Sequence, residues 1–344
     1  MGELEVVMRA DGGPGIGLGH LRRCVALAEA LRGRGAAVTF VVPDHPVLVA
    51  TVEHAGFAAR TVEPEEAATL AVTRVIARQL GAAAVVLDGY DIREDALRPA
   101  LAPLTVVIDD LADRELPVDV VVNGNLYAPR LVYRVAPHTL VLAGSRYAIL
   151  LPEFADSPER PVRSRVENVL ITLGGGDESG LTPALLGAVA RAVPQAAIDA
   201  VLGPMAPPGL DGATAAAAAR ARVHRAPASL RTLMLQADLA VTGGGQTLYE
   251  LAAMGVPAVT IELARNQRLN IEGLAALGGT VPAGRASAPD LASRVGGLVA
   301  QLDGDPARRQ AMARAGRGAL DGRGAGRVAD VLVAKVTAAR SVTS

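Results

Sequence analysis

The sequence feature that most constrains this chain is a glycine-rich segment, Gly12–Arg23 (GGPGIGLGHLRR), which directly follows a short apolar run. The run Glu5–Ala10 predicts a first strand, and the apolar spacing after His20 predicts a helix. Glycines between a strand and a helix let the backbone approach a ligand closely, and amides at a helix N-terminus favour an anion. The segment therefore predicts a histidine beside a site for a phosphorylated ligand.

These glycines do not have the spacing of a dinucleotide-binding fingerprint. That fingerprint requires a third glycine three residues after the second, and the corresponding positions hold Leu18 or His20. Asp44, after the expected second strand, imitates the ribose-binding acid of such folds, so an oxidoreductase with a nucleotide cofactor stays as a minor alternative. The G-x-x-x-x-G-K-[ST] pattern of P-loop NTPases does not occur in the sequence. We therefore expect no cofactor.

Composition argues against several other function classes. The chain has 344 residues, 50% hydrophobic and 20% charged, which fits two globular domains. A net charge of −1 and few aromatic residues argue against a nucleic-acid partner. Cys24 is the single cysteine, so an internal disulfide or a thiolate metal site is excluded and a buried structural thiol is expected. We find no signal peptide and no apolar run long enough to span a bilayer, so we expect a cytoplasmic protein without integral membrane contact.

Apolar, β-branched runs alternate with helical patterns along the chain. Unbroken apolar strands indicate burial on both faces, which is typical of parallel sheets covered by helices. The polar, proline-containing stretch 152–165 lacks periodicity and is the best linker candidate. We therefore predict an α/β chain with two Rossmann-like domains. The first domain covers 1–151 and the second covers 166–322, with a linker over 152–165 between them and a C-terminal helix or tail over 323–344. Two such doubly wound domains are expected to face each other across a central cleft that binds ligand at the carboxyl ends of the strands.

The patterns also predict individual elements. The expected strands are Val38–Val42, Ala84–Leu87, Thr105–Ile108, Val118–Val122, Thr139–Leu142, Asn168–Leu173, Ala197–Leu202, Arg222–His224, Leu239–Thr242, Ala258–Ile261 and Gly279–Val281. The expected helices include Glu65–Leu80, Ile92–Leu101, Leu181–Val193, Leu230–Ala237, Thr247–Met254, Leu269–Leu277 and Gly324–Arg340.

Two further glycine loops follow expected strands in the second half of the chain. Gly174–Gly176 follows one strand, and Gly243–Gly245 follows another and opens a helix that contains Glu250. A triple glycine at a helix N-terminus cradles phosphate oxygens, and Thr247 would add a hydroxyl donor. Taken alone, a triple glycine is as often a tight turn. Three such loops at strand-to-helix junctions together favour a phosphorylated ligand.

With these motifs the chain resembles the PseG/SpsG-like group of nucleotide-sugar hydrolases within the GT-B glycosyltransferase superfamily. The matching segments, spread over residues 5–280, are RAD and GIGLGHLRR within Arg9–Arg23, DGY at Asp88–Tyr90, IDDLADR at Ile108–Arg114, DVVVNGN at Asp119–Asn125, GSRYAILLPEF at Gly144–Phe154, LITLGGGD at Leu170–Asp177, GGGQTLYE at Gly243–Glu250 and NQ at Asn266–Gln267. Each motif is weak alone, but their common order is specific for the superfamily.

The resemblance implies a GT-B-like fold and metal-independent cleavage of a nucleotide-linked, UDP-type deoxy amino sugar at its anomeric carbon, with release of the nucleoside diphosphate. His20 matches the family's proposed base, which would take a proton from the attacking water, and an imidazole suits that role near neutral pH. By the same matching, Tyr90 would line the sugar pocket, and Glu250 and Asn266 would contact ribose or phosphate. The Gly243–Gly245 amides would stabilise charge on the leaving diphosphate. The full set of candidate substrate-binding residues is Gly17, Gly19, Arg22, Asp88, Tyr90, Asp110, Asn125, Tyr147, Gly174, Gly175, Gly243, Gly244, Gly245, Gln246, Thr247, Glu250, Asn266 and Gln267.

A metal site is not expected. Asp109 and Asp110 are adjacent, but neighbouring residues at a strand end point in opposite directions, so a loop-anchoring or sugar-contacting role is favoured. The histidines other than His20 lack metal-ligand spacing. Among them, His224 precedes the expected helix Leu230–Ala237 and is a weak candidate for a nucleoside contact.

Two positions depart from the family pattern. Relatives commonly have D-H-Y where this chain has Gly89, and often an arginine where it has Leu151. Both changes remove polar groups near the expected sugar, which leaves three alternatives open. The first is a hydrolase, the second is an inverting glycosyltransferase in which His20 deprotonates an acceptor hydroxyl, and the third is a non-catalytic subunit that binds a nucleotide sugar.

Overall fold

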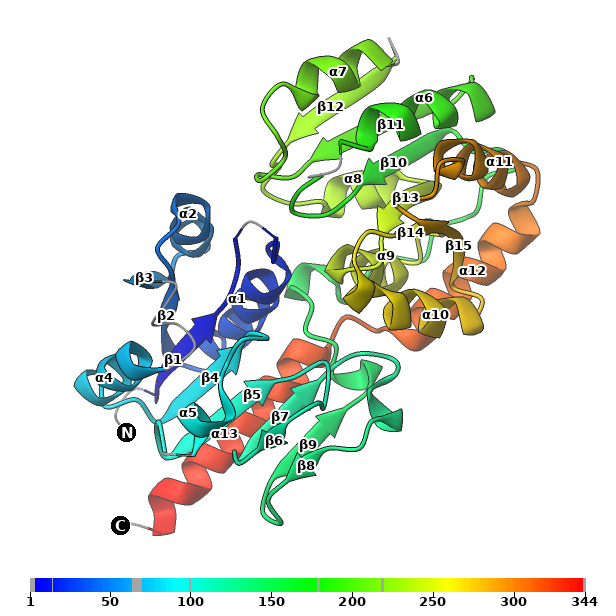
Figure 1. Cartoon of the computed structure of the whole chain (residues 1–344). Helices are drawn as coiled ribbons and strands as arrows, with labels where there is room; N and C mark the ends of the chain where they lie inside the picture. Colours follow the sequence, from blue (N-terminus) through cyan, green and yellow to red (C-terminus); the bar gives the residue numbers. More distant parts are fainter. Residues whose placement is uncertain are drawn as a thin grey trace. The chain divides into compact units, whose positions relative to one another are not determined.

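The computed structural model describes residues 4–13, 15–63, 70–98, 100–177, 180–217 and 220–342. The chain forms two compact units, each built around its own parallel sheet (Figure 1). Unit 1 consists of Met1–Pro152 and Gly322–Ser344, and unit 2 consists of Glu153–Asp321. The C-terminal helix therefore belongs to the same unit as the first strand.

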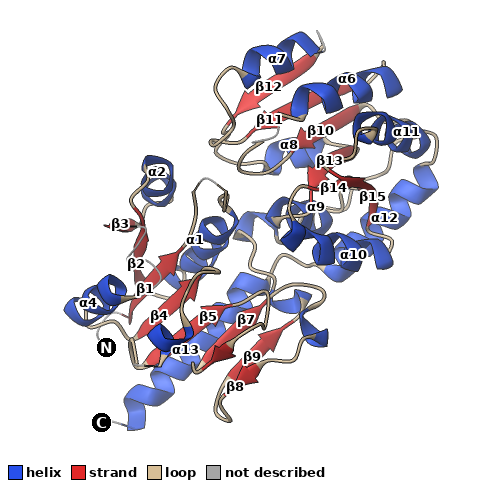
Figure 2. Cartoon of the chain, in the orientation of Figure 1, coloured by secondary structure: helices blue, strands red, loops and turns tan. Residues whose placement is uncertain are grey.

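Unit 1 contains a seven-stranded parallel sheet in the order β3-β2-β1-β4-β5-β7-β9 (Figure 2). Its strands are β1 (Leu4–Ala10), β2 (Ala36–Pro43), β3 (Ala58–Val62), β4 (Ala84–Asp88), β5 (Leu104–Ile108), β7 (Val120–Asn123) and β9 (Leu140–Ala143). A small two-stranded sheet pairs β6 (Glu115–Leu116) with β8 (Arg134–Val135). The helical elements are α1 (Gly19–Arg32), α2 (Pro46–His54), α4 (Ala71–Gln79), α5 (Glu94–Leu97), η1 (Ala128–Arg130), η2 (Ser145–Tyr147) and α13 (Gly324–Val342).

The central strands of unit 1 are buried on both faces. Every residue of β4 and β5 is buried, as the continuous apolar runs predict. One face carries Val7, Val85 and Val107 against α4, which contributes Ala77 to the same cluster. Arg34, in the turn after α1, donates from Nε to Asp330 Oδ1 of α13 at 2.7 Å.

Unit 2 contains a six-stranded parallel sheet in the order β12-β11-β10-β13-β14-β15. Its strands are β10 (Asn168–Thr172), β11 (Ala197–Leu202), β12 (Ala221–Arg225), β13 (Leu239–Gly243), β14 (Ala258–Glu262) and β15 (Thr280–Arg285). Its helical elements are α6 (Thr182–Ala192), α7 (Leu210–Ala217), α8 (Arg231–Gln236), α9 (Gln246–Ala253), η4 (Arg265–Gln267), α10 (Arg268–Ala276), α11 (Leu291–Asp303) and α12 (Pro306–Ala319), and η3 (Pro152–Phe154) lies at the junction of the units. Its core joins β10, β13 and β14 to α6 and α11 through fully buried Leu, Ile and Val side chains.

The predicted α/β class with two doubly wound parallel sheets is confirmed. In unit 1 the first strand, β1, lies between β2 and β4. In unit 2 the first strand, β10, lies between β11 and β13. The strand order therefore reverses at β1 and at β10. Loops that leave the carboxyl ends of these strands diverge, and such switch points are where open α/β sheets bind ligands. The glycine loops after β1 and β10 lie at these two points.

Two predicted helices need correction. The helix expected over Ile92–Leu101 is limited to α5, because Pro99 lacks the backbone N–H that a continuing helix requires. Of the helix expected over Glu65–Leu80, the structure describes α4, and residues 64–69 lie outside the described residues.

Candidate functional site

In unit 1, the glycine loop delivers His20 to the first turn of α1. Gly13, Gly15 and Gly17 have φ angles of 124°, 77° and 80°, a region that other residues rarely adopt. Gly13 and Gly17 also bridge to each other, which closes the loop into a tight turn. The glycine pattern therefore has a conformational cause, and its result is a fixed entry into α1 one residue before His20.

His20 is paired with Asp88 at the carboxyl end of β4. The ring Nδ1 lies 2.6 Å from Asp88 Oδ1, and the Asp88 side chain is completely buried. Burial opposes ionisation of Asp88, but the charge of Arg23 and the contact with His20 outweigh it and hold the pKa of Asp88 well below its usual range. An ionised carboxylate only accepts hydrogen bonds, so Nδ1 must carry the proton. The lone pair of the neutral ring is then on Nε2, which is free to act as a base.

Arg23 joins this pair to a second carboxylate. Its Nε and Nη2 donate to Asp88 Oδ2 and Oδ1 at 2.6 and 2.7 Å, and its Nη1 donates to both oxygens of Asp110 at 2.9 and 2.8 Å. The side chain is 14% exposed. Burial would lower the pKa of Arg23, but the two carboxylates raise it well above its usual value. Arg23 therefore remains a fixed positive charge between two buried negative charges.

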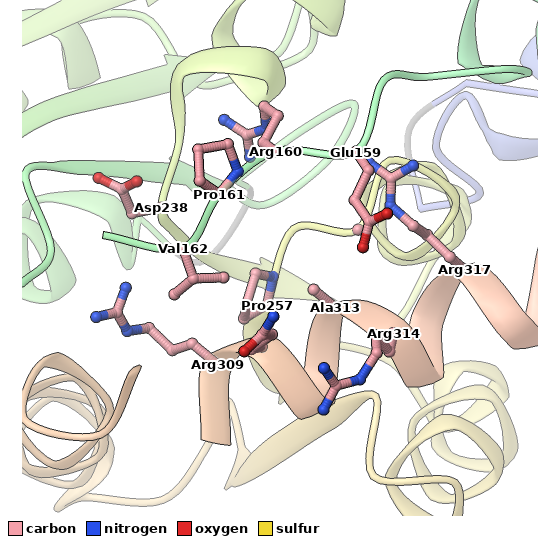
Figure 3. Close-up of a pocket in the computed structure, with 12 residues that line it drawn as sticks. Glu159, Arg160, Pro161, Val162, Asp238, Pro257, Arg309, Ala313, Arg314 and Arg317 are labelled. Atoms are coloured by element: carbon pink, nitrogen blue, oxygen red, sulfur yellow. The ribbon is translucent and has the colours of Figure 1, made fainter. Parts of the chain in front are cut away.

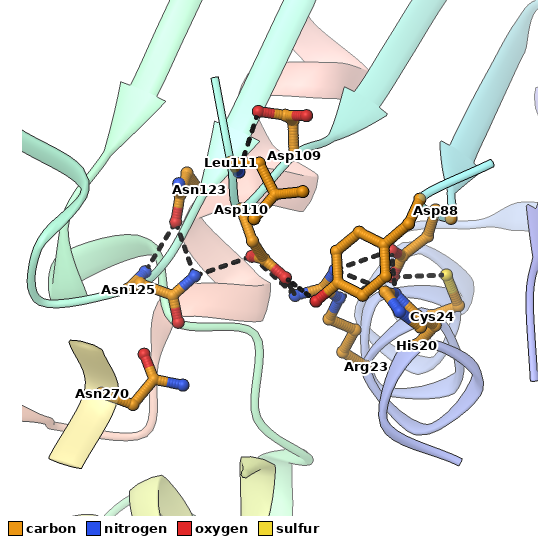
Figure 4. A network of polar contacts seen from close by, with 12 residues as sticks. His20, Arg23, Cys24, Asp88, Asp109, Asp110, Leu111, Asn123, Asn125 and Asn270 are labelled. Carbon is orange, nitrogen blue, oxygen red and sulfur yellow. Dashed lines mark hydrogen bonds and ion pairs between the residues drawn. The ribbon is translucent and has the colours of Figure 1, made fainter. Parts of the chain in front are cut away.

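The network continues from Asp110 along the carboxyl edge of the sheet (Figure 4). Asn125, after β7, donates to Asp110 Oδ1 at 2.7 Å and to Asn123 Oδ1 at 2.8 Å. The Tyr90 hydroxyl donates to Asp110 Oδ2 at 3.2 Å, and the Tyr90 ring meets the His20 ring edge-on with centroids 4.6 Å apart. The structure thus brings together five predicted site residues from four successive strand ends: His20, Asp88, Tyr90, Asp110 and Asn125.

Asp109 and Asp110 have separate partners. Asp109 Oδ2 accepts the backbone N–H groups of Leu111 and Ala112 at 3.2 and 2.7 Å, which holds a turn in which Ala112 has a φ of 53°. Burial raises the pKa of Asp109. Asp110 oxygens are engaged by Arg23, Asn125 and Tyr90 as described above. Over the described residues, no group of three or more His, Cys, Asp or Glu side chains has the arrangement of a metal site.

Gly89, one of the departures from the family pattern, lies against Asp11. A Cβ atom at position 89 would overlap the Asp11 carboxylate. Asp11 is held in this place by Arg9, which donates to it and is only 1% exposed, and by its own N–H, which donates to the Asp88 carbonyl at 2.9 Å. The absence of a side chain at position 89 is therefore a packing requirement of this Asp11 conformation.

In unit 2, the Gly243–Gly245 loop lies between β13 and α9. Gly243 and Gly244 are buried, and the Gly244 N–H donates to Gln267 Oε1 at 3.0 Å. Gln267 Oε1 also accepts the N–H of Leu263 at 3.2 Å. The Gly244 amide is thus engaged within the protein, and Gly245, which is partly exposed at the N-cap of α9, is the loop glycine open to a ligand.

The loop after β10 is arranged for close backbone approach. Gly174 has a φ of 89°, and a Cβ atom at Gly203 would overlap the carbonyl group of Gly175. Asp177 ends the described part of this loop and accepts the N–H groups of Leu181 and Thr182 at 2.9 and 2.7 Å, at the start of α6. Gly174 and Gly175 are both partly exposed.

The remaining predicted residues occupy varied positions. Thr247 and Glu250 are buried on α9, at 6% and 4% exposure, and Gln246 is the first residue of that helix. In η4, after β14, Asn266 is exposed. The remaining candidates of unit 1 lie around the carboxyl edge of its sheet and are Gly17, Gly19, Arg22 and Tyr147.

His224, the weak nucleoside candidate, is engaged inside unit 2. Its Nε2 lies 2.7 Å from Asp199 Oδ1, and Arg222 donates to both oxygens of the same carboxylate. The contacts of Arg222 and His224 hold the pKa of Asp199 below its usual value despite burial. His224 therefore contributes to an ion-paired cluster across β11 and β12.

A pocket in unit 2 lies at the opposite, amino-terminal edge of the sheet (Figure 3). Asp238 and Pro257, which line it, immediately precede β13 and β14. Three of its arginines donate to backbone carbonyls: Arg160 to Leu235 and Ala237, Arg309 to Leu302, Arg163 and Ser164, and Arg317 to Ser157, Pro158 and Met254. These bonds connect residues 157–164 to the rest of unit 2, so the arginines stabilise the path of this segment.

Sequence reasoning selected Arg22 and missed Arg23 as a site residue. A signal was present, because residues three apart on a helix share a face and Arg23 is three residues after His20. Asp11 and Asn123 were also missed. Both lie within the matched motifs, but their roles depend on contacts that spacing does not show.

Comparisons with known proteins agree with this architecture. No family model matches the chain. The chain is 26% identical over 96% of its length to the spore coat polysaccharide biosynthesis protein SpsG of Bacillus subtilis, of which it covers 98%. Among solved structures, it superposes on MurG of Acinetobacter baumannii with a TM-score of 0.62 and 18% identity, covering 96% of this chain and 99% of that one. It superposes on the spinosyn rhamnosyltransferase SpnG, solved in complex with thymidine diphosphate, with a TM-score of 0.60 and 17% identity over 99% and 100% of the two chains.

These similarities confirm the resemblance to the SpsG/PseG-like group and the GT-B-like fold. None of the helices in the described ranges is long and apolar enough to cross a membrane.

Proposed function

We propose that this chain is an enzyme that uses a nucleotide-activated sugar and hydrolyses it at the anomeric carbon. The observation that carries the proposal is the His20–Asp88 pair, which fixes the proton on Nδ1 and leaves Nε2 as a base. Unit 2 supports the same proposal, because its glycine loops after β10 and β13 are of the kind that binds a diphosphate. SpsG, the curated relative, is named for polysaccharide biosynthesis, and SpnG was solved with a nucleoside diphosphate.

In the proposed reaction, a water oxygen attacks C1 of the sugar while its proton passes to His20 Nε2. The bond between C1 and the diphosphate oxygen breaks, and its electron pair leaves with the nucleoside diphosphate. Asp88 stabilises the imidazolium that forms, because its carboxylate accepts the Nδ1 proton in a buried, charge-assisted hydrogen bond. Gly245, Gln246 and Thr247 at the start of α9 would stabilise the negative charge on the leaving diphosphate through backbone N–H groups.

We propose that the reaction does not need a metal ion. The carboxylates best placed to hold one, Asp109 and Asp110, already accept hydrogen bonds from backbone amides and from Arg23 and Asn125. Arg23 and the α9 N-terminus provide positive charge in the two units. The sugar is proposed to be a UDP-linked deoxy amino sugar, on the motif resemblance described above.

An inverting glycosyltransferase is the second candidate, and a specific observation favours it. The named solved relative SpnG is a rhamnosyltransferase with nearly complete coverage of both chains. In this alternative His20 Nε2 takes its proton from an acceptor hydroxyl. A non-catalytic nucleotide-sugar binding subunit is the third reading, and it predicts binding without turnover.

Release of free nucleoside diphosphate tests these candidates directly. UDP-, GDP- and TDP-linked amino sugars are incubated with the native protein and with His20→Ala, without an acceptor and then with added hydroxyl acceptors. The hydrolase is supported if diphosphate appears without acceptor and the rate falls by about 100-fold or more in His20→Ala, the usual contribution of a general base. Release only with an acceptor identifies the transferase. Binding of a nucleotide sugar that is unchanged in His20→Ala, with no release under any condition, refutes both enzymatic candidates.

A further inference from the structure

Among the described residues, Arg23 is the one cationic side chain that contacts both the His20–Asp88 pair and the next carboxylate along the sheet edge, Asp110. Its Nη2 lies 3.1 Å from His20 Nδ1. Because Nδ1 already carries a proton, this contact is not a hydrogen bond from the guanidinium to the ring. It instead places a positive charge directly beside the imidazole, where it opposes a second proton on the ring.

Two opposite influences therefore act on His20. The Asp88 carboxylate favours the imidazolium form, and the Arg23 guanidinium disfavours it. The groups that surround this pair from other elements are the Asp110 carboxylate, the Tyr90 phenol, the Cys24 thiol that faces Asp88 Oδ2 at 3.6 Å, and the Arg9–Asp11 pair beside Gly89. Arg9 and Asp11 compensate each other, and Arg23 compensates one of the two carboxylates that it contacts, Asp88 and Asp110. The charged groups around the ring therefore carry one net negative charge with Arg23 in place and two without it.

Arg23 also fixes the direction of Asp88. It makes one bond to each Asp88 oxygen, so the carboxylate plane is set and Oδ1 is held toward His20. Its remaining nitrogen grips Asp110, which in turn accepts from Asn125 and Tyr90. A bidentate, planar guanidinium can hold both carboxylates at once, and an ammonium group cannot.

We propose that Arg23 is a positioning residue that orients Asp88 and, with its charge beside Nδ1, opposes the addition of a second proton to the His20 ring. This inference rests on the proposed function for its kinetic consequences. Its claim about the ring is independent of turnover.

Two substitutions separate the charge of Arg23 from its geometry. Arg23→Gln removes both, whereas Arg23→Lys keeps the positive charge and loses the simultaneous hydrogen bonds to Asp88 and Asp110. Arg32→Met is the matched control, because Arg32 lies on the same helix but donates to the backbone carbonyls of Ala55 and Gly56 at its exposed end. Thermal unfolding of each variant establishes that the protein is folded.

The direct readout is a histidine-ring NMR titration of the full chain. The protein has five histidines, and His20→Gln assigns the signal of interest. In Arg23→Gln we expect the His20 ring to gain its second proton at a higher pH than in the native protein, because the positive charge 3.1 Å from Nδ1 is gone. In Arg23→Lys and Arg32→Met the titration should stay near the native midpoint.

The kinetic readout is the pH profile of kcat/KM for diphosphate release. In Arg23→Gln the acid limb should move to higher pH by the same amount as the NMR midpoint. In Arg23→Lys the acid limb should stay at its native pH, while kcat falls about tenfold or more and KM changes little. The His20 base is then misoriented, but substrate binding is unaffected. Arg32→Met should match the native profile.

A native titration midpoint in Arg23→Gln overturns the proposal, as does native kcat in Arg23→Lys. If Arg23→Gln does not fold, Asp110→Asn supplies the second test, because it frees one side of Arg23 and should broaden or split the His20 ring signals. Unchanged ring signals in Asp110→Asn would count against the positioning role. If no substrate in the panel is turned over by the native protein, the proposed function fails, and the NMR titration still decides the role of Arg23.

Discussion

Replacement of Asp88 by asparagine is the most informative single perturbation of unit 1. The carboxylate is fully buried and accepts His20 Nδ1 at 2.6 Å and Arg23 Nε and Nη2 at 2.6 and 2.7 Å. An asparagine has nearly the same shape, but it is uncharged and one of its two positions becomes a donor. Whichever way the amide is turned, a donor then faces either His20 or Arg23.

The change in the free energy of unfolding depends on which charge partners Arg23 keeps after the substitution. Removal of one member of a buried ion pair usually costs about 3–5 kcal/mol, because the other charge is left uncompensated. Arg23 keeps two bonds to Asp110, so it is not left without a counter-charge. We therefore expect Asp88→Asn to lower the free energy of unfolding of unit 1 by about 3 kcal/mol, the lower end of that range.

The assay must read the two units separately, because a chain with two units need not unfold in one step. The chain has no tryptophan, so hydrogen exchange followed by peptide mass analysis is preferable to fluorescence. Peptides from β1, β4 and β5 should lose protection by about 100-fold in Asp88→Asn, whereas peptides from β10 and β13 should not change. Asp330→Asn is the control, because it breaks an exposed Asp–Arg pair in the same unit and should leave protection unaltered. Protection of β4 within twofold of the native value would refute the reasoning.

Three further expectations concern stability and metal dependence. Gly89→Ala should destabilise unit 1 by about 1–3 kcal/mol, because the added Cβ overlaps with Asp11. Gly33→Ala is the control and should not destabilise it, because its Cβ meets only ordinary contacts at 3.5 Å or more. Equal urea midpoints for the two variants would contradict the packing argument. Because the folded pKa of Asp88 is depressed, its contribution to stability is present above the unfolded pKa of about 3.9 and is lost as the pH falls below it. Urea midpoints from pH 7 to pH 3 should therefore fall more steeply for the native protein than for Asp88→Asn. Parallel curves would show that ionisation of Asp88 does not contribute to the pH dependence of stability. Diphosphate release should persist after EDTA treatment and dialysis, and loss of activity that added Mg²⁺ restores would refute a metal-independent reaction.

The fold could be predicted from the sequence because its signals are periodic and local. Buried parallel strands need continuous apolar runs, and the runs at 84–87, 105–108 and 239–242 became β4, β5 and β13. The glycine loops could be placed for the same reason, since each follows such a run. The helix expected at 92–101 was wrong because its apolar spacing outweighed Pro99 in the interpretation.

The site was only partly predictable because its arrangement depends on side-chain contacts between segments that are far apart in the sequence. The motifs identified His20, Asp88 and Asp110, and the three-residue spacing places Arg23 on the same helix face as His20. The spacing does not show that Arg23 also reaches both carboxylates. The Gly244 amide illustrates the same limit. Glycine at a helix N-terminus implies a free N–H, and only the fold reveals that Gln267, 23 residues later, accepts it.

The two departures from the family pattern differ in what they demand of the rest of unit 1. A histidine at position 89 requires the Asp11 carboxylate to leave its place, and Asp11 is the acceptor for Arg9, which is 1% exposed and has further buried nitrogens without an acceptor. Displacing Asp11 therefore leaves a buried cation uncompensated, at a cost that one added imidazole does not offset. Leu151 is only half-buried, so an arginine there extends toward solvent without displacing a charge. The residue at position 89 is thus coupled to the Arg9–Asp11 pair, and any attempt to restore the family's polar group beside Tyr90 has to change position 11 together with position 89.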